Sequence, residues 1–154
     1  MLIEHQAISE YFFGNVFSAD SLFCDLSPKI AQSLTAIKQK KRFTKNEIVF
    51  ASGELPGCIF FLLMGEAQML SSAKLTGKNL VRSIEPDEIL GLTEAIANLP
   101  YETLLKTVTP CLFECIQSDD FFRFLQNEPE VCFRLLQRLG ANLQKVYQLF
   151  ARQS

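Results

Sequence analysis

The sequence predicts a mainly β fold with flanking α-helices. An eight-stranded antiparallel jelly-roll barrel is expected between N-terminal helices and a long C-terminal helix. Apolar residues have helical spacing near the N-terminus and again after Gln117. Between these regions the chain breaks into short apolar segments separated by Gly or Asn, as antiparallel strands do. A length of 154 residues fits one domain over 1–154, with N-terminal helices 4–36, a barrel 37–117 and C-terminal helices 118–150.

Two helices are expected before the barrel. Residues 4–17 place Ala7, Ile8, Tyr11 and Phe12 at helical spacing. After a linker, Ser27 is suited to be an N-cap and Pro28 to be the first residue of a helix. The apolar face of this second helix is expected to consist of Ile30, Ala31, Leu34 and Ile37.

The strands of the barrel are expected at 37–43, 47–51, 58–64, 67–72, 78–84, 88–91, 103–109 and 111–117. The segment 58–64 is apolar without alternation, which predicts a strand buried on both faces. The first strand carries a basic cluster bracketed by Ile37 and Phe43. We expect it to be a solvated edge strand rather than a nucleic-acid or partner site; the cluster consists of Lys38, Lys40, Lys41, Arg42 and Lys45.

Two helices are expected after the barrel. Ser118 is suited to cap a short helix over 119–127, and Pro129 precedes a long helix to about Phe150. Spacings of three and four residues in the long helix predict a dimer seam, made of Cys132, Leu136, Leu139, Leu143, Val146 and Phe150. The alternative is a surface helix packed on its own barrel, with Leu135, Tyr147 and Leu149 facing inward. Both interpretations can hold at once.

Three motifs in the barrel resemble those of a known family. Gly53-Glu54 precedes the aromatic segment Ile59–Leu62 and then Gly65, and Gly77 falls in a predicted hairpin. The segment 85–91, Glu-Pro-Asp-Glu-Ile-Leu-Gly, is followed by Leu92-Thr93 and later by Pro100-Tyr101-Glu102. Over residues 23–150 the chain resembles the cyclic-nucleotide-binding sensor domains of Crp/Fnr transcription regulators. That resemblance implies a cyclic-nucleotide-binding-like jelly roll whose C-terminal helix dimerises.

The family's phosphate-binding cassette is only partly present. In the family, a glycine lets the backbone approach the ligand, a Glu binds the ribose and an Arg binds the phosphate. Gly91 matches, whereas the Glu position falls on Leu92 and the Arg position on or beside Tyr101. Glu102 would repel a phosphate there, while Arg82 and Lys106 are nearby cations for which a solvated strand face is the favoured interpretation.

The resemblance thus implies a ligand site that differs from the family pattern. The ligand-binding residues expected from it are Arg82, Gly91, Leu92, Thr93, Glu94, Tyr101, Glu102 and Thr103. The expected effector is a cyclic nucleotide or another small molecule, and ordinary cyclic AMP is not favoured because the cassette Arg is missing. Leu80 and Leu90 complete the predicted lining, with plain barrel core as the alternative.

The sequence therefore favours a non-enzymatic ligand-sensing and dimerisation domain of a Crp/Fnr-like transcription regulator. The alternative is a stand-alone cyclic-nucleotide-binding module that acts through a protein partner. A net charge of −2 and the absence of a helix-turn-helix after the long helix argue against direct DNA binding by this chain, although a DNA-binding domain can follow in the native gene.

Other chemistry is poorly supported. His5 is the single histidine, so metal, nucleophilic and haem sites lack the ligands or bases they need. The five cysteines are spread without CxxC spacing, which predicts reduced thiols in the cytoplasm. No signal peptide is apparent, and the longest apolar run, 58–64, is far below the roughly 20 residues of a membrane span.

Overall fold

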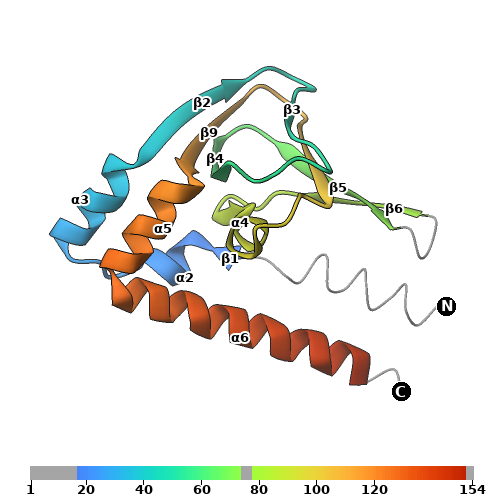
Figure 1. Cartoon of the computed structure of the whole chain (residues 1–154). Helices are drawn as coiled ribbons and strands as arrows, with labels where there is room; N and C mark the ends of the chain where they lie inside the picture. Colours follow the sequence, from blue (N-terminus) through green and yellow to red (C-terminus); the bar gives the residue numbers. More distant parts are fainter. Residues whose placement is uncertain (1–16, 74–77, 152–154) are drawn as a thin grey trace.

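The computed structural model describes residues 17–73 and 78–151 as two antiparallel sheets with helices gathered at one end and along one side (Figure 1). The elements are, in order, β1 (Phe17–Ser18), α2 (Ala19–Phe23), α3 (Pro28–Ala36), β2 (Lys38–Phe43), β3 (Ile48–Phe50), β4 (Cys58–Met64), β5 (Ala67–Ala73), β6 (Lys78–Ser83), β7 (Glu88–Leu90), α4 (Leu92–Ala97), β8 (Thr103–Thr107), β9 (Cys111–Gln117), α5 (Ser118–Asn127) and α6 (Pro129–Ala151). The predicted fold class is confirmed.

One sheet has the order β1-β7-β4-β9-β2, and the other has the order β3-β8-β5-β6. Eight of these strands lie where the sequence predicts them. β1 is an addition of two residues that pairs with β7, placing Phe17 opposite Ile89 and Ser18 opposite Glu88. The predicted helix over 4–17 and the hairpin glycine Gly77 lie outside the described residues.

Two apolar cores organise the molecule. One lies between the sheets and contains Phe60, Met69, Leu90, Tyr101 and Phe113. The other joins the β1-β7-β4-β9-β2 sheet to the helices, because Ile59 and Phe61 of β4 pack with residues of α2, α4, α5 and α6. β4 therefore faces apolar surroundings on both sides over residues 59–62, as its sequence predicts, while Leu63 and Met64 at its end are exposed.

The helix ends show why the chain turns where it does. Ser27 caps α3, since its hydroxyl accepts a hydrogen bond from the Ile30 amide, 3.3 Å away. The prediction that Ser118 caps the next-to-last helix is wrong. Ser118 is the first residue of α5, Gln117 is the N-cap, and the Ser118 hydroxyl donates to the Pro56 carbonyl instead, at 3.3 Å.

β2 is an edge strand of its sheet, and Lys40, Lys41 and Arg42 on it are exposed. This confirms the solvated edge that the sequence predicts. Lys38 is the partial exception, because its Nζ lies 3.5 Å from Glu114 and 5.6 Å from the ring centroid of Phe61. A charged edge of this kind discourages pairing with a strand of another molecule.

Candidate ligand-binding site

The loop between β7 and β8 folds around Gly91 and α4. Gly91 precedes α4 with a φ of 81°, a left-handed conformation that strains residues with a Cβ. A Cβ added there would lie 3.2 Å from Cε1 of Tyr101 and 3.4 Å from the Cys58 carbonyl oxygen. A residue with a Cβ at this position is therefore strained by its backbone angle, and the Tyr101 ring would have to move by a few tenths of an ångström to admit it.

Tyr101 is locked into the barrel core and is 3% exposed. Its ring stacks on Phe50, and its hydroxyl donates a hydrogen bond to the Cys58 carbonyl, 3.2 Å away. Its backbone is fixed as well, because the Tyr101 amide donates to Glu54 at 2.9 Å and its carbonyl accepts from Gly53 at 2.8 Å. The sequence suggests a hydroxyl donor or a surface turn here. The structure shows a buried hydroxyl that donates to the chain itself.

The charges of two carboxylates, Glu94 and Glu54, act on Tyr101. Burial raises the pKa of the Tyr101 hydroxyl, and the negative charge of Glu94 raises it further, with smaller contributions that include Glu54. Burial also raises the pKa of Glu94, to which repulsion from Glu102 adds. The Tyr101 ring therefore lies in a negative field, and this environment disfavours an anionic phosphate beside it.

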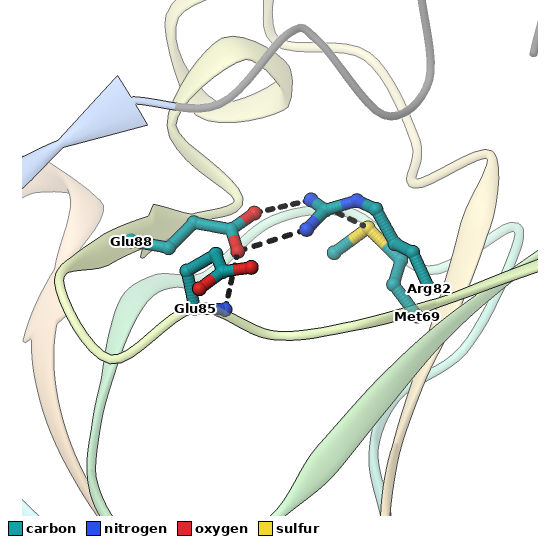
Figure 2. Close-up of polar contacts among 4 residues, drawn as sticks. All are labelled: Met69, Arg82, Glu85 and Glu88. Carbon is teal, nitrogen blue, oxygen red and sulfur yellow. Dashed lines mark hydrogen bonds and ion pairs between the residues drawn. The ribbon is translucent and has the colours of Figure 1, made fainter. Parts of the chain in front are cut away.

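Arg82, on β6, forms a buried ion pair with Glu88 on β7 (Figure 2). Its Nη1 donates to Oε2 of Glu88 at 2.8 Å, and its Nη2 donates to Oε1 in a two-pronged contact. Arg82 is 8% exposed and Glu88 is 3% exposed, so the interpretation of Arg82 as a solvated strand residue is wrong. Its Nη2 also lies 3.7 Å from the sulfur of Met69, which belongs to the core between the sheets.

The other predicted site residues lie in different surroundings. Leu92 packs in the core beside the helices, whereas Leu90 belongs to the core between the sheets. Thr93 and Glu102 are exposed, and Thr103 is half-buried on β8 opposite Ser71. The structure therefore brings Gly91, Glu94, Tyr101 and Glu102 together around one loop, while Arg82 points toward Glu88 from the second sheet.

Sequence reasoning missed Glu88 and Glu54 as parts of this site. Glu88 follows Arg82 by six residues across a turn, and Glu54 precedes Tyr101 by 47, so no local spacing connects them. The one available signal was the position of Glu88, the acidic residue of the segment 85–91 that begins the predicted strand 88–91. A carboxylate buried in a barrel strand needs a cation, and Arg82 is the basic residue of the preceding strand whose side chain reaches it.

The residues of the predicted dimer seam on α6 differ in their exposure. Cys132 and Leu139 pack against the core beside the helices, so these two side chains serve the chain's own fold. Leu136 and Leu143 are more than half exposed, and so are Phe133 and Tyr147. Leu135 faces inward as predicted, but Tyr147 does not, and the side chains of Leu149 and Phe150 lie outside the described part of the chain.

The described residues give little support to metal binding or thiol chemistry. Within residues 17–73 and 78–151, no three His, Cys, Asp or Glu side chains gather as metal ligands. Burial raises the pKa values of the Cys111 and Cys115 thiols, which disfavours their reactive thiolate forms. Across the same ranges, no helix has the length and apolar character needed to cross a membrane.

Comparisons with known proteins agree with this fold. The sequence matches the family described as Cyclic nucleotide-binding domain over residues 40–128. A comparison with curated protein sequences gave no significant match. Among solved structures, the Catabolite Activator Protein of Thermus thermophilus is similar, with a TM-score of 0.75 and 16% identity; the alignment covers 85% of this chain and 62% of that one.

Two further structures are similar over most of both chains. The N-terminal domain of a transcriptional regulator from Streptomyces coelicolor A3(2) has a TM-score of 0.70 and 18% identity, covering 84% of this chain and 91% of that one. The sensor domain of the transcriptional regulator DNR from Pseudomonas aeruginosa has a TM-score of 0.66 and 23% identity, covering 80% and 87%. At these identities the likeness shows the fold.

Proposed function

The chain belongs to the cyclic nucleotide-binding domain family, and we propose that it is the non-enzymatic ligand-sensing and dimerisation domain of a Crp/Fnr-like transcription regulator. We further propose that its effector is not ordinary cyclic AMP. The solved structures with similar folds include a sensor domain and an N-terminal domain of transcriptional regulators, which supports the first statement. The surroundings of Tyr101 support the second.

Tyr101 is the observation that carries the proposal. On or beside the position where the family pattern has an Arg to bind the phosphate, this chain has a buried ring held by Phe50 and by the Cys58 carbonyl. A cyclic phosphate bound there would lose charge-assisted hydrogen bonds, each worth about 1.5–3 kcal/mol. It would also meet the repulsion of Glu94 and Glu102; burial and, to a smaller extent, the charge of Glu102 raise the pKa of Glu94.

Arg82 does not restore the missing charge. Its guanidinium is bound by both oxygens of Glu88, and the pair is almost fully buried. A phosphate that bound Arg82 would have to displace this carboxylate and leave it buried without its cation, which is unfavourable. The effector of this domain is therefore expected to be recognised by the polar groups and apolar surface near Gly91, Glu94 and Thr103 rather than by a phosphate-binding Arg.

Dimerisation is proposed to use the exposed side of α6. Phe133, Leu136, Gly140, Leu143 and Tyr147 follow one another at spacings of three, four, three and four residues. The four large side chains of this stripe are each at least half exposed. This exposed stripe shares Leu136 and Leu143 with the seam predicted from sequence, and it is free of the core contacts made by Cys132 and Leu139.

Isothermal calorimetry with the purified protein tests the effector proposal. Cyclic AMP and cyclic GMP are expected to bind weakly or not at all. A submicromolar affinity for either nucleotide would contradict the proposal, because it would require a phosphate contact that the Tyr101 environment disfavours. If an effector is found, Thr103→Ala is expected to weaken its binding more than Lys40→Ala, since Lys40 lies on the exposed edge strand β2.

A further inference from the structure

The short helix α2 connects the barrel to the long helix α6. It has five residues, and one of them, Leu22, is 1% exposed in the core that it shares with Val131 and Leu135 of α6. A helix this short has almost no stability of its own. Its position therefore depends on the contacts that hold its two ends, and both ends are held by charged side chains from other elements.

Asp87 holds the N-terminal end of α2. Its carbonyl accepts a hydrogen bond from the Ala19 amide at 2.8 Å. Its Oδ2 accepts from the Asp20 amide at 3.1 Å and from the Ser18 hydroxyl at 2.5 Å. A carboxylate at this end satisfies amides that lack partners within the helix and interacts favourably with the helix dipole.

Glu88 fixes the turn that positions Asp87. One carboxylate oxygen, Oε2, accepts from Nη1 of Arg82 and also from the Glu85 amide, 3.1 Å away (Figure 2). The Glu88 amide donates back to the Glu85 carbonyl at 3.2 Å. Glu88 also lies directly opposite Ser18 in the pairing of β1 with β7. The same carboxylate thus binds Arg82 and closes the turn that carries Asp87.

Arg134, on α6, holds the C-terminal end of α2. Its Nη1 donates to the Cys24 carbonyl at 2.5 Å and to the Leu22 carbonyl at 3.3 Å. Its Nη2 pairs with Glu130 of the same helix at 3.2 Å. Arg134 therefore satisfies carbonyls that the end of α2 leaves open and ties them to the first half of α6.

We infer that α2 transmits a change at the Arg82–Glu88 ion pair to α6. When the Glu88 carboxylate leaves Arg82 and moves, the Glu85 amide loses the Oε2 acceptor that closes the turn at residues 85–88. Asp87 then shifts together with the start of α2. Because Leu22 is packed tightly, α2 moves as a unit and carries the carbonyls that Arg134 binds. The inference rests on the proposed sensing function, since it names the route by which the barrel would act on the helix that carries the exposed stripe.

Amide hydrogen exchange on the whole chain, without any effector, tests this route. Glu88→Gln keeps the size of the side chain and weakens its hold on Arg82. Glu85→Gln is the matched control, because it makes the same chemical change on an exposed side chain of the same turn. The expected result is an increase of roughly fivefold in the exchange of α2 and of the first half of α6, with α3 unchanged and no effect in the control.

Two results would overturn the inference. In one, the increase stops at β6 and β7; in the other, α3 exchanges faster to the same extent, which would mean general destabilisation. Should Glu88→Gln fold poorly, Arg134→Gln examines the route from its other end. Coupling is reciprocal, so that variant must speed exchange in the turn 85–88 and in β7, and an effect confined to α2 and α6 would again overturn it.

The outcome is separable from that of the effector experiment. Exchange is measured on the unliganded protein, so its failure leaves the calorimetric prediction intact. Conversely, strong binding of cyclic AMP would contradict the proposed effector specificity without altering the exchange pattern of the variants.

Discussion

The Tyr101 ring lies almost parallel to the Phe50 ring, with 3.9 Å between centroids and 13° between planes. This stacking, together with the hydrogen bond from the Tyr101 hydroxyl to Cys58, fixes the side chain against Gly91. An effector cannot use the position of Tyr101 without breaking contacts that also stabilise the barrel core. The difference from the family pattern is therefore structural as well as electrostatic.

Removing one partner of the Arg82–Glu88 pair should be much more harmful than removing both. Arg82→Met leaves Glu88 buried without its cation and is expected to lower the free energy of unfolding by about 3–5 kcal/mol. The double variant Arg82→Met with Glu88→Leu should recover most of that loss, because no unpaired charge remains. Urea unfolding at one protein concentration measures both. A double variant that is less stable than the single variant would refute the account of the pair.

Glu94 should make stability depend on pH. Burial and Glu102 raise the pKa of the Glu94 carboxyl above its usual value of about 4.3, so the folded protein binds this proton more tightly than the unfolded chain. Its contribution to the free energy of unfolding is therefore greatest at low pH and falls as the pH rises through the raised pKa.

Glu94→Gln should abolish this dependence. The variant is expected to be more stable than the wild type at about pH 7–8, with the difference disappearing as the pH falls to about 4. Urea unfolding at several pH values measures it, with the exposed Glu66→Gln as the control. A wild type that outperforms Glu94→Gln at neutral pH would show that the Glu94 charge is stabilised rather than opposed.

The exposed stripe of α6 should carry the dimer. Leu136→Glu combined with Leu143→Glu is expected to give a folded monomer, because both side chains are more than half exposed in the single chain and charge in an apolar seam is unfavourable. Ala141→Glu with Gln148→Glu adds two negative charges at exposed positions of α6 that do not flank the stripe. Sedimentation should show a monomer for the first pair and a dimer for the second; a dimer for both would exclude the stripe.

Substitutions at two glycines should distinguish the destabilisation caused by backbone strain from that caused by steric overlap. Gly53 and Gly65 have φ angles of 93° and 98°, but a Cβ at Gly53 would meet nothing within 4 Å, whereas one at Gly65 would lie 2.4 Å from the Pro110 carbonyl oxygen. Gly53→Ala should lower the free energy of unfolding by about 1–2 kcal/mol through strain alone. Gly65→Ala should lower it by at least roughly 1 kcal/mol more through overlap. Equal losses in thermal or urea unfolding would contradict the close approach at Gly65.

The strands were predictable because glycine and asparagine separate short apolar segments, and because 58–64 lacks alternation. The helix α2 was not predictable, because five residues show no clear helical period. Ser18 at its N-cap was nevertheless a usable signal. The prediction that Ser118 is an N-cap was wrong because its hydroxyl donates a hydrogen bond to the Pro56 carbonyl in the folded chain. Such tertiary partners are not visible in local sequence.

The predicted dimer seam shows why spacing alone leaves two possible surfaces on α6. Spacings of three and four residues fit two adjacent registers on α6, which share Leu136 and Leu143. The register through Cys132 and Leu139 has more apolar residues, while the exposed register is interrupted by Gly140. Composition therefore favours the register that contains two side chains packed on the chain's own core. Only the packing of Cys132 and Leu139 against the core distinguishes them.

The loop that carries Gly91 was predictable from the motif order, whereas the Arg82–Glu88 ion pair was not. The departure at Tyr101 is visible from the motif order, but its burial depends on Phe50, which is far away in sequence. Arg82 was misjudged because most arginines are exposed and its partner lies on another strand. The burial of both side chains depends on partners that are distant in sequence or lie on another strand.

The most direct test compares the affinity of the wild type and of Tyr101→Arg for cyclic AMP by calorimetry. We predict weak or undetectable binding by the wild type and binding at least about tenfold tighter by the variant, since one charge-assisted contact is worth about 1.5–3 kcal/mol. Glu102→Ser added to Tyr101→Arg should tighten binding further by removing repulsion. Submicromolar binding by the wild type, or equal affinities of the wild type and a folded Tyr101→Arg, would contradict the account.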